Sequence, residues 1–343
     1  RVLSASAAYS EPIAKNHLLE FTARLSSNEE NLTRTTIDVY SGGFLEEFSP
    51  IFNMSENTRG IAMAYKYTGQ EHNLDVSLRG NAYTQGAIES RFESTIENRT
   101  YMYLLPSINY NWSLSSFSRL SFNYGTDVQL PELTQLLTLR DITNPLITYV
   151  GNANLEPQFN QSVWAHYGTW NSFSGYGVWG FISAGRTDNV ISTSQTIDNQ
   201  YVRTFTPENF DTPAYNVRGN VSYNQSINAI GMRTRVGANS SWSSSPSRIN
   251  GDLNEQTNTS AGGSLSVSNL NQDILEVSVG GSWNMNWSTF SLQERLNQEY
   301  LSQSYFVDFE WNVTKALGVE SGVEMNNYSN ASFAEDQFVP VWN

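Results

Sequence analysis

The residues of this sequence that could do acid–base chemistry are carboxylates at even spacing. Asp308 and Glu310 are two residues apart, and Glu320 and Glu324 are four residues apart. Even spacing puts both members of a pair on one face of a β-strand, and paired carboxylates can act as general acid and general base. The sequence completes no catalytic constellation around them, so we expect no enzymatic activity.

Metal and cofactor chemistry has equally little support. The three histidines, His17, His72 and His166, are far apart and form no H-x-x-x-H pair, and the chain has no cysteine. Neither a disulfide framework nor a cysteine metal site can therefore form. His17 lies beside a predicted turn, where local hydrogen bonding is the simpler role. We expect no metal and no cofactor.

The charge balance argues against nucleic acid as a partner. The formal net charge is −14, and lysine occurs only at Lys15, Lys66 and Lys315. The chain also has no polybasic run that a nucleic-acid backbone or a membrane surface could read.

β-strands must position these side chains, because the apolar residues alternate with a period of two. In TPAYNVRGNVSYNQS (212–226), apolar side chains and glycine occupy the odd positions from Tyr215 to Tyr223, and polar ones occupy the even positions between them. Such alternation predicts a strand with one apolar and one polar face. The same pattern recurs in the segments 61–67, 74–79, 108–114, 120–124, 275–287 and 305–313.

A transmembrane barrel explains this pattern better than a soluble sandwich, propeller or adhesin. The polar face consists mainly of Asn, Ser and Gly, and charged residues make up only 15% of the chain, whereas soluble sheets display many charges. Strands of about ten residues fit a tilted bilayer crossing, with aromatic residues near the strand ends. We expect one domain over residues 1–343, an antiparallel outer-membrane β-barrel with about 14–16 strands in this chain.

The connections between the predicted strands come in two lengths. Tight polar turns are expected near 224–228 and 270–273. Long loops are expected at 41–56, 128–158, 187–211, 243–258 and 288–302. Alternating short and long connections place the long loops together at one end of the sheet.

The fixed charges on the polar face would line the lumen of such a barrel. They would set the electric field that a solute meets, or they would hold a plug. The alternative is a cross-strand ladder of charge pairs, each worth a fraction of a kcal/mol. The candidate lumen residues are Asp75, Arg79, Arg218, Arg233, Arg235, Asp308 and Glu310.

One loop, VQLPELTQLLTLRDITNPLITYVGNANLEPQFNQ (128–161), is unusually long for a compact domain, and such loops are usually functional. We expect it to fold over the barrel mouth, with a tight positive-φ turn at Gly151-Asn152. Its prolines deny a helix or a central strand. The candidate mouth residues are Pro131, Gln135, Pro145, Gly151, Asn152 and Pro157.

The motifs of this loop carry a resemblance. Pro131 to Leu136 reads P-x-x-x-Q-L, 144–146 reads N-P-L, and Gly151 to Pro157 reads G-N-x-x-L-x-P, as in the loop of TonB-dependent-receptor-like barrels. The segment YSEPIAKNHLLEF (9–21) resembles the corresponding strand and turn of the outer-membrane β-barrel family of Bacteroidota. The resemblance covers most of the chain and identifies the barrel without identifying its cargo.

The resemblance implies a barrel of about 22 strands in the bacterial outer membrane, with a plug domain opened by TonB. Nothing in this sequence resembles a plug or a TonB box, and its end (337–343) resembles the start of a late strand. We therefore expect part of a larger barrel. The implied function is nutrient uptake, with membrane lipids, TonB and a surface lipoprotein as partners. A structural or assembly subunit of an outer-membrane complex is the alternative.

Overall fold

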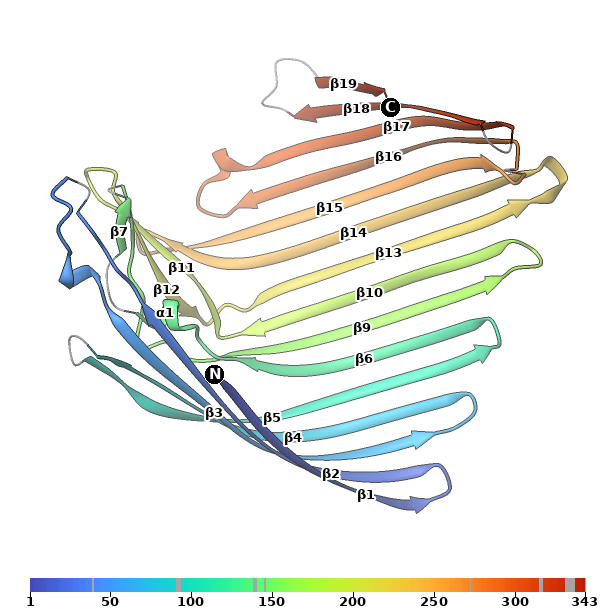
Figure 1. The fold of residues 1–343 in the computed structure, drawn as a ribbon. Helices are drawn as coiled ribbons and strands as arrows, with labels where there is room; N and C mark the ends of the chain where they lie inside the picture. Colours follow the sequence, from blue (N-terminus) through green and yellow to red (C-terminus); the bar gives the residue numbers. More distant parts are fainter. Residues whose placement is uncertain are drawn as a thin grey trace.

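The computed structural model describes residues 1–38, 40–90, 94–137, 141–144, 146–271, 273–314, 317–330 and 337–342. Almost all of them belong to one 19-stranded sheet. Four of these strands lie in loops, and the other fifteen form a meander in which each strand pairs antiparallel with the next (Figure 1). The predicted all-β antiparallel architecture is confirmed.

The meander strands and the loop elements have the following bounds. The meander strands are β1 (Val2–Ala14), β2 (His17–Thr33), β3 (Ile51–Thr68), β4 (His72–Glu89), β5 (Ser94–Ser115), β6 (Ser118–Gln129), β9 (Gln158–Asn171), β10 (Tyr176–Asp188), β13 (Ala214–Ile227), β14 (Met232–Ile249), β15 (Asp252–Asn269), β16 (Leu275–Phe290), β17 (Gln298–Thr314), β18 (Leu317–Asn330) and β19 (Gln337–Trp342). The loop elements are β7 (Asp141–Asn144), β8 (Ile147–Tyr149), β11 (Val190–Ile197), β12 (Arg203–Phe210), α1 (Leu133–Leu136) and three short 3-10 turns, Glu46–Phe48, Asn228–Ile230 and Glu294–Leu296.

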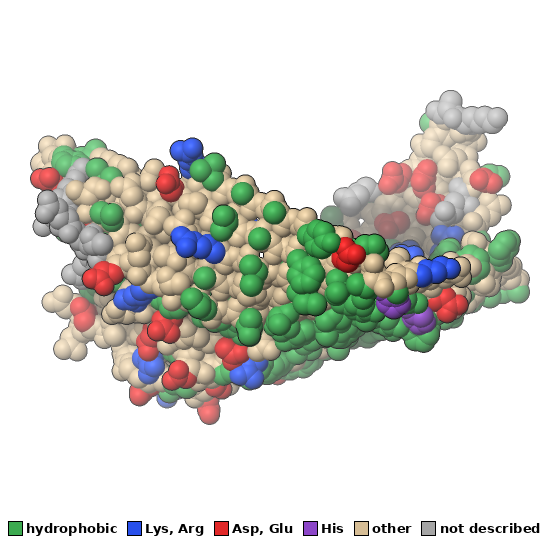
Figure 2. All heavy atoms as spheres, turned by 90° about the horizontal axis from the view of Figure 1, so that it is seen from below, with side chains coloured by type: hydrophobic (Ala, Val, Ile, Leu, Met, Phe, Trp, Pro, Cys, Tyr) green, Lys and Arg blue, Asp and Glu red, His purple; other side chains and the backbone are tan. Residues whose placement is uncertain are grey.

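The sheet is a curved wall whose two faces differ in chemistry. On β4, Asp75, Ser77 and Arg79 point to the concave face, while Val76 and Leu78 point to the convex face. Residues paired across neighbouring strands share a face, so this alternation propagates along the whole meander. Figure 2 shows apolar side chains gathered on the convex surface of the wall. In the described residues β1 and β19 do not pair with each other, so the wall is open (Figure 1).

Short turns and long connections lie at opposite ends of the strands, as predicted (Figure 1). One predicted loop, 243–258, is wrong. There β14 and β15 continue as a regular hairpin, from the pair Ser243–Asn258 to the pair Ile249–Asp252. Asn250 and Gly251 close it with φ of 51° and 94°, the left-handed geometry of tight hairpin turns. Beyond the apolar part of the convex face, both faces of β14 and β15 are mainly polar. The sequence 243–258 therefore lacks the alternation that would have predicted these strand ends.

A smaller branch of the same sheet lies at the end of the wall that carries the long connections. β7 pairs with β8, β8 runs parallel to β12, β12 pairs with β11, and β11 runs parallel to the end of β14. We call β7, β8, β11, β12 and this end of β14 the mouth sheet. The strand β14 therefore belongs both to the wall and to the mouth sheet.

The described residues of the segment 130–157, here called the mouth loop, pack against the concave face. Leu133 and Leu136 of α1 and Leu155 form a buried cluster with Phe52 and Met54 of β3. The cluster explains why this part of the concave face is apolar. In the described part of the chain no helix is long and apolar enough to cross a membrane.

Candidate functional site

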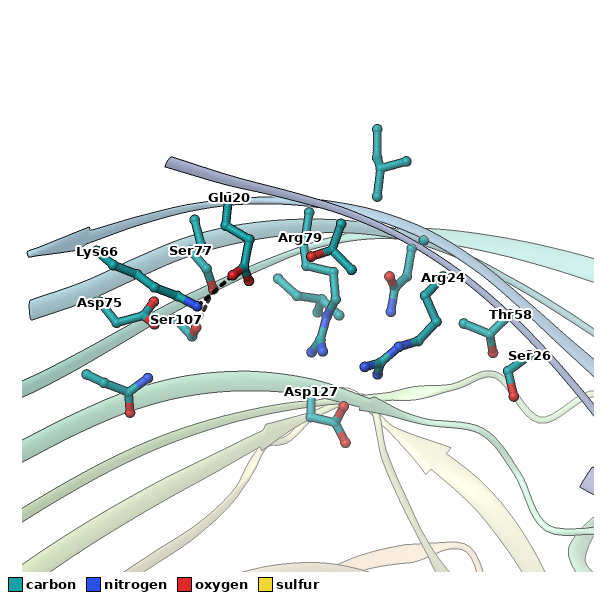
Figure 3. Close-up of a pocket in the computed structure, with 18 of the residues that line it drawn as sticks. Glu20, Arg24, Ser26, Thr58, Lys66, Asp75, Ser77, Arg79, Ser107 and Asp127 are labelled. Atoms are coloured by element: carbon teal, nitrogen blue, oxygen red, sulfur yellow. Dashed lines mark hydrogen bonds and ion pairs between the residues drawn. The ribbon is translucent and has the colours of Figure 1, made fainter. Parts of the chain in front are cut away.

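The candidate site is a polar pocket on the concave face of β2 to β6, with a volume of about 540 Å³. Small residues of β3, Gly60, Ala62 and Ala64, form its floor. Three cationic and three anionic side chains surround this floor (Figure 3). These charged side chains are Glu20, Arg24, Lys66, Asp75, Arg79 and Asp127.

One half of the pocket is internally paired. The ammonium of Lys66 lies 3.0 Å from a carboxylate oxygen of Glu20, and about a third of each side chain is exposed. Asp75 occupies the position opposite Lys66 on the neighbouring strand. The hydroxyls of Ser77 and Ser107 are hydrogen-bonded at 2.6 Å beside them. An ion pair exposed to this extent contributes at most about 1 kcal/mol, so it fixes geometry more than stability.

The other half of the pocket holds two arginines side by side. Arg24 on β2 and Arg79 on β4 extend in the same direction, toward Asp127 of β6 (Figure 3). Neither guanidinium forms an ion pair within the described residues, and the Nε of Arg79 is buried without a hydrogen-bond partner. Two adjacent cations on a small-residue floor can bind a carboxylate or phosphate group.

The mouth loop adjoins the end of the pocket nearest to the long connections, where Leu130 packs against a small apolar cluster. Tyr83 and Leu105 line the pocket and pack with Val128. Just beyond them the buried side chain of Gln85 donates hydrogen bonds to the carbonyl of Pro131 at 2.7 Å and to Glu56 at 2.9 Å. The loop is thus attached to the concave face by both apolar and polar contacts.

The predicted lumen residues share the concave face but fall into three separate groups. Asp75 and Arg79 lie in the pocket, the arginines of β13 and β14 form a second group, and the carboxylates of β17 belong to a third. Arg218 donates to Ser183 Oγ at 3.2 Å, and Arg235 donates to Asn224 Oδ1 at 2.9 Å. Arg233 faces Ser226 and Ser268.

The carboxylates of the third group face one another. Glu310 lies between Glu276 and Glu320 on the adjacent strands, and Asp308 lies between Ser278 and Gly322. Like charges on facing positions are unfavourable. The expected ladder of opposite charges is therefore wrong for these residues and for the arginines of β13 and β14. Their predicted role toward a solute or plug remains a prediction.

Sequence reasoning missed an aromatic cluster on the concave face. Register places Trp164 and His166 of β9 and Trp179 and Phe181 of β10 on this face. The rings of Trp164 and His166 are stacked with centroids 5.7 Å apart, and Trp179 contacts both His166 and Phe181. The even spacing of Trp164 and His166 could have revealed the cluster, but it requires knowing which face is the lumen. Arg24, Lys66 and Glu20 were missed as a group for the same reason.

The predicted mouth residues hold the loop together. Pro131 and Pro157 are fully buried, and the carbonyl of Pro157 accepts a hydrogen bond from Asn189 Nδ2 at 3.0 Å. The Gln135 carbonyl accepts the amide of Asn152 at 2.7 Å, and Gln135 Oε1 accepts the amide of Glu132 at 2.9 Å. Pro145 lies outside the described residues.

The expected positive-φ turn at Gly151-Asn152 is wrong. Positive φ occurs elsewhere in the described chain, at residues such as Gly42 and Asn189, but not at this pair. A Cβ on Gly151 would lie 2.1 Å from the carbonyl oxygen of Leu137. Glycine is therefore required for close backbone approach rather than for turn geometry.

The described residues contain no group of His, Cys, Asp and Glu that could hold a metal ion. His17 Nδ1 is hydrogen-bonded to Tyr65 Oη at 2.7 Å, and His72 Nδ1 to Tyr110 Oη at 2.8 Å. These pairs lie on the convex face near the short turns, where aromatic residues border the apolar belt. The predicted local role of His17 agrees with this contact.

Solved structures of similar fold include two metal transporters. The structure of the copper transporter OprC matches with a TM-score of 0.58 and 11% identity, covering 99% of this chain and 55% of that one. The FrpB iron transporter from Neisseria meningitidis (F3-3 variant) matches with a TM-score of 0.53 and 10% identity, covering 95% of this chain and 50% of that one. The chain thus spans about half the length of these structures, and the likeness concerns the fold. A comparison with curated protein sequences gives no match.

The sequence itself matches one protein family over most of its length. The profile of the "Outer membrane protein beta-barrel family" matches residues 1–332. The polar concave face, the apolar convex face and the antiparallel meander agree with this match. The chain belongs to the outer membrane protein beta-barrel family and lies in the bacterial outer membrane.

Proposed function

We propose that this chain forms the wall of an outer-membrane transporter that takes up a water-soluble nutrient with energy supplied through TonB. The family match supports the membrane location. The folds that it resembles are those of a copper transporter and an iron transporter. TonB would act on a plug held against this wall, and a surface lipoprotein would approach from the long connections.

The observation that carries the proposal is the chemistry of the concave face. A wall that served only as a scaffold could pack its interior with apolar side chains. Here the concave face presents a pocket of about 540 Å³ lined by six charged side chains, of which Arg24 and Arg79 form no ion pair in the described chain. Such groups remain unpaired at low cost only in contact with water, a solute or a polar partner.

The roles of the other predicted residues follow from their positions. Arg218, Arg233 and Arg235 line one stretch of the concave face and Asp308 and Glu310 another, so a passing solute meets fixed charges of both signs. The mouth loop controls access to the pocket because it packs directly beside it.

The test is nutrient-limited growth. A strain lacking the gene is grown on ferric chelates, cupric chelates and single carbon sources, one at a time. It is then complemented with the full-length wild-type gene or with Arg24→Glu/Arg79→Glu. We expect one condition in which deletion abolishes growth, the wild type restores it, and the double variant restores it poorly although it is present in the outer membrane. Unchanged growth in every condition, with stoichiometric partner proteins on purification, would instead favour the structural-subunit alternative.

A further inference from the structure

The convex face of β1 to β5 contains a continuous apolar groove. Register sets its side chains in rows across the strands, and small residues fill the middle of two adjacent rows. Ala23 on β2 and Gly80 and Ala82 on β4 form the floor, while Ile61 and Leu104 stand beside them. Side chains this small between larger ones leave a channel in the surface.

Two hollows mark this channel, with volumes of about 550 Å³ and 930 Å³. Ala23, Ile61, Gly80 and Leu104 line both hollows, so the two are continuous. The larger one extends along the strands toward Phe21 and is almost wholly apolar. Figure 2 shows apolar side chains gathered over this part of the convex surface.

One cation lies at the end of the groove. Arg59 of β3 points to the convex face, opposite Leu25 and Ala82, and it lines the smaller hollow. It is exposed and forms no ion pair with the described residues. Arg186 offers a contrast on the same face, because its guanidinium is bound to Asp188 at 2.6 Å.

Arg59 also marks the edge of the apolar belt. The next row toward the long connections is polar, with Ser27, Asn57, Thr84 and Thr100 in facing positions. In the other direction the belt runs about 26 Å along β3 to Tyr67 and its aromatic neighbours. Long connections of such barrels face the cell exterior, so Arg59 lies at the headgroup level of the outer leaflet.

We propose that this groove binds a phosphorylated glycolipid of the outer leaflet, with an acyl chain in the apolar channel and a phosphate on Arg59. Bulk lipid is as apolar as the groove, so burial alone selects no lipid, and the selection comes from packing and charge. The small residues allow close packing of a flexible chain. The guanidinium matches phosphate geometry through paired N–H donors, and a weakly hydrated interface strengthens that bond.

The test is native mass spectrometry of the full-length protein in detergent, incubated with a purified bisphosphorylated outer-leaflet glycolipid or with mixed phosphatidylethanolamine and phosphatidylglycerol. Arg59→Gln removes the charge, and Ala82→Phe fills the channel. The matched controls are Arg186→Gln and Ala238→Phe, which make the same changes on the convex face outside the groove.

We expect glycolipid binding to fall about tenfold or more in both groove variants, since a charge-assisted bond or its channel is lost. Both controls should stay within about twofold of wild type, as ordinary surface substitutions do. Arg59→Lys should retain part of the binding, which separates charge loss from misfolding. Binding unchanged by Arg59→Gln, or phospholipid binding as tight as glycolipid binding, would overturn the proposal.

Discussion

Gly151 of the mouth loop has no room for a side chain. Its ideal Cβ position is 2.1 Å from the carbonyl oxygen of Leu137 and 2.7 Å from that of Gln135. Both contacts are with backbone, so no change of side-chain rotamer can relieve them. Gly151→Ala must therefore displace one strand of the loop from the other.

The cost of this displacement has two parts. Forcing a methyl group into a packed site costs about 1–3 kcal/mol. Separating the backbones also weakens the 2.7 Å hydrogen bond from the Asn152 amide to the Gln135 carbonyl, worth about 1 kcal/mol. Together these lower the local stability of the mouth loop by about 2–4 kcal/mol, which corresponds to about 30-fold to 700-fold more frequent opening.

Hydrogen exchange of the full-length protein in detergent or nanodiscs measures this opening directly. We expect amides of the described mouth loop to exchange faster by that factor in Gly151→Ala, while β13 to β16 remain protected. The control is Gly125→Ala, where the nearest atoms to the new methyl group are 3.8 Å away. If the mouth-loop amides of Gly151→Ala exchange within about threefold of wild type, the close-approach argument fails.

Three other measurements test the remaining features. Because the chain has no cysteine, Ser77→Cys on the concave face should react with a membrane-impermeant thiol reagent at least about tenfold faster than Leu78→Cys; equal rates would contradict the assigned faces. Arg248→Met removes a 2.9 Å ion pair with Glu208, in which each side chain is one-third exposed. We expect the amides of β11 and β12 to exchange about fivefold faster in this variant. Unchanged exchange would mean that backbone hydrogen bonds alone stabilise the pair β11–β12. Burial raises the pKa of Tyr149 above its ordinary value. The neutral phenol therefore stabilises the mouth sheet at neutral pH, and this stability is lost as the pH rises through the raised pKa. An NMR titration of the Tyr149 Cζ resonance that gives a pKa at or below that of free tyrosine would refute this.

The wall could be predicted because the bilayer imposes a strict pattern on it. Val76 and Leu78 alternate with Asp75, Ser77 and Arg79 because one face meets lipid and the other meets water. Where a strand extends beyond the bilayer, both of its faces meet water and the alternation of apolar and polar residues is lost. The hairpin from Ser243 to Asn258 has polar residues on both faces, so its sequence reads as a loop although its backbone pairs regularly.

The site could be predicted only in part. Period-two alternation places each charge on a face, but it does not tell which strands are neighbours at which register. Arg24 and Arg79 come together across β3 because their opposing positions there are occupied by Gly60 and Ala62. The role of Gly151 could not be predicted for a similar reason. Its sequence neighbours suggest a turn, but the residue that requires glycine there is Leu137, fourteen positions earlier in the chain.

The sharing of β14 has a consequence for engineering this barrel. In many barrels a surface loop can be exchanged as a module, because only its two ends meet the wall. Here β11 runs alongside Arg248 and Ile249, and Gln195 accepts the amide of Asn250 at 2.8 Å. Transplanting either long connection alone would leave backbone groups of its neighbours without partners. The mouth sheet and the strand on which it is built can be transferred only as one unit.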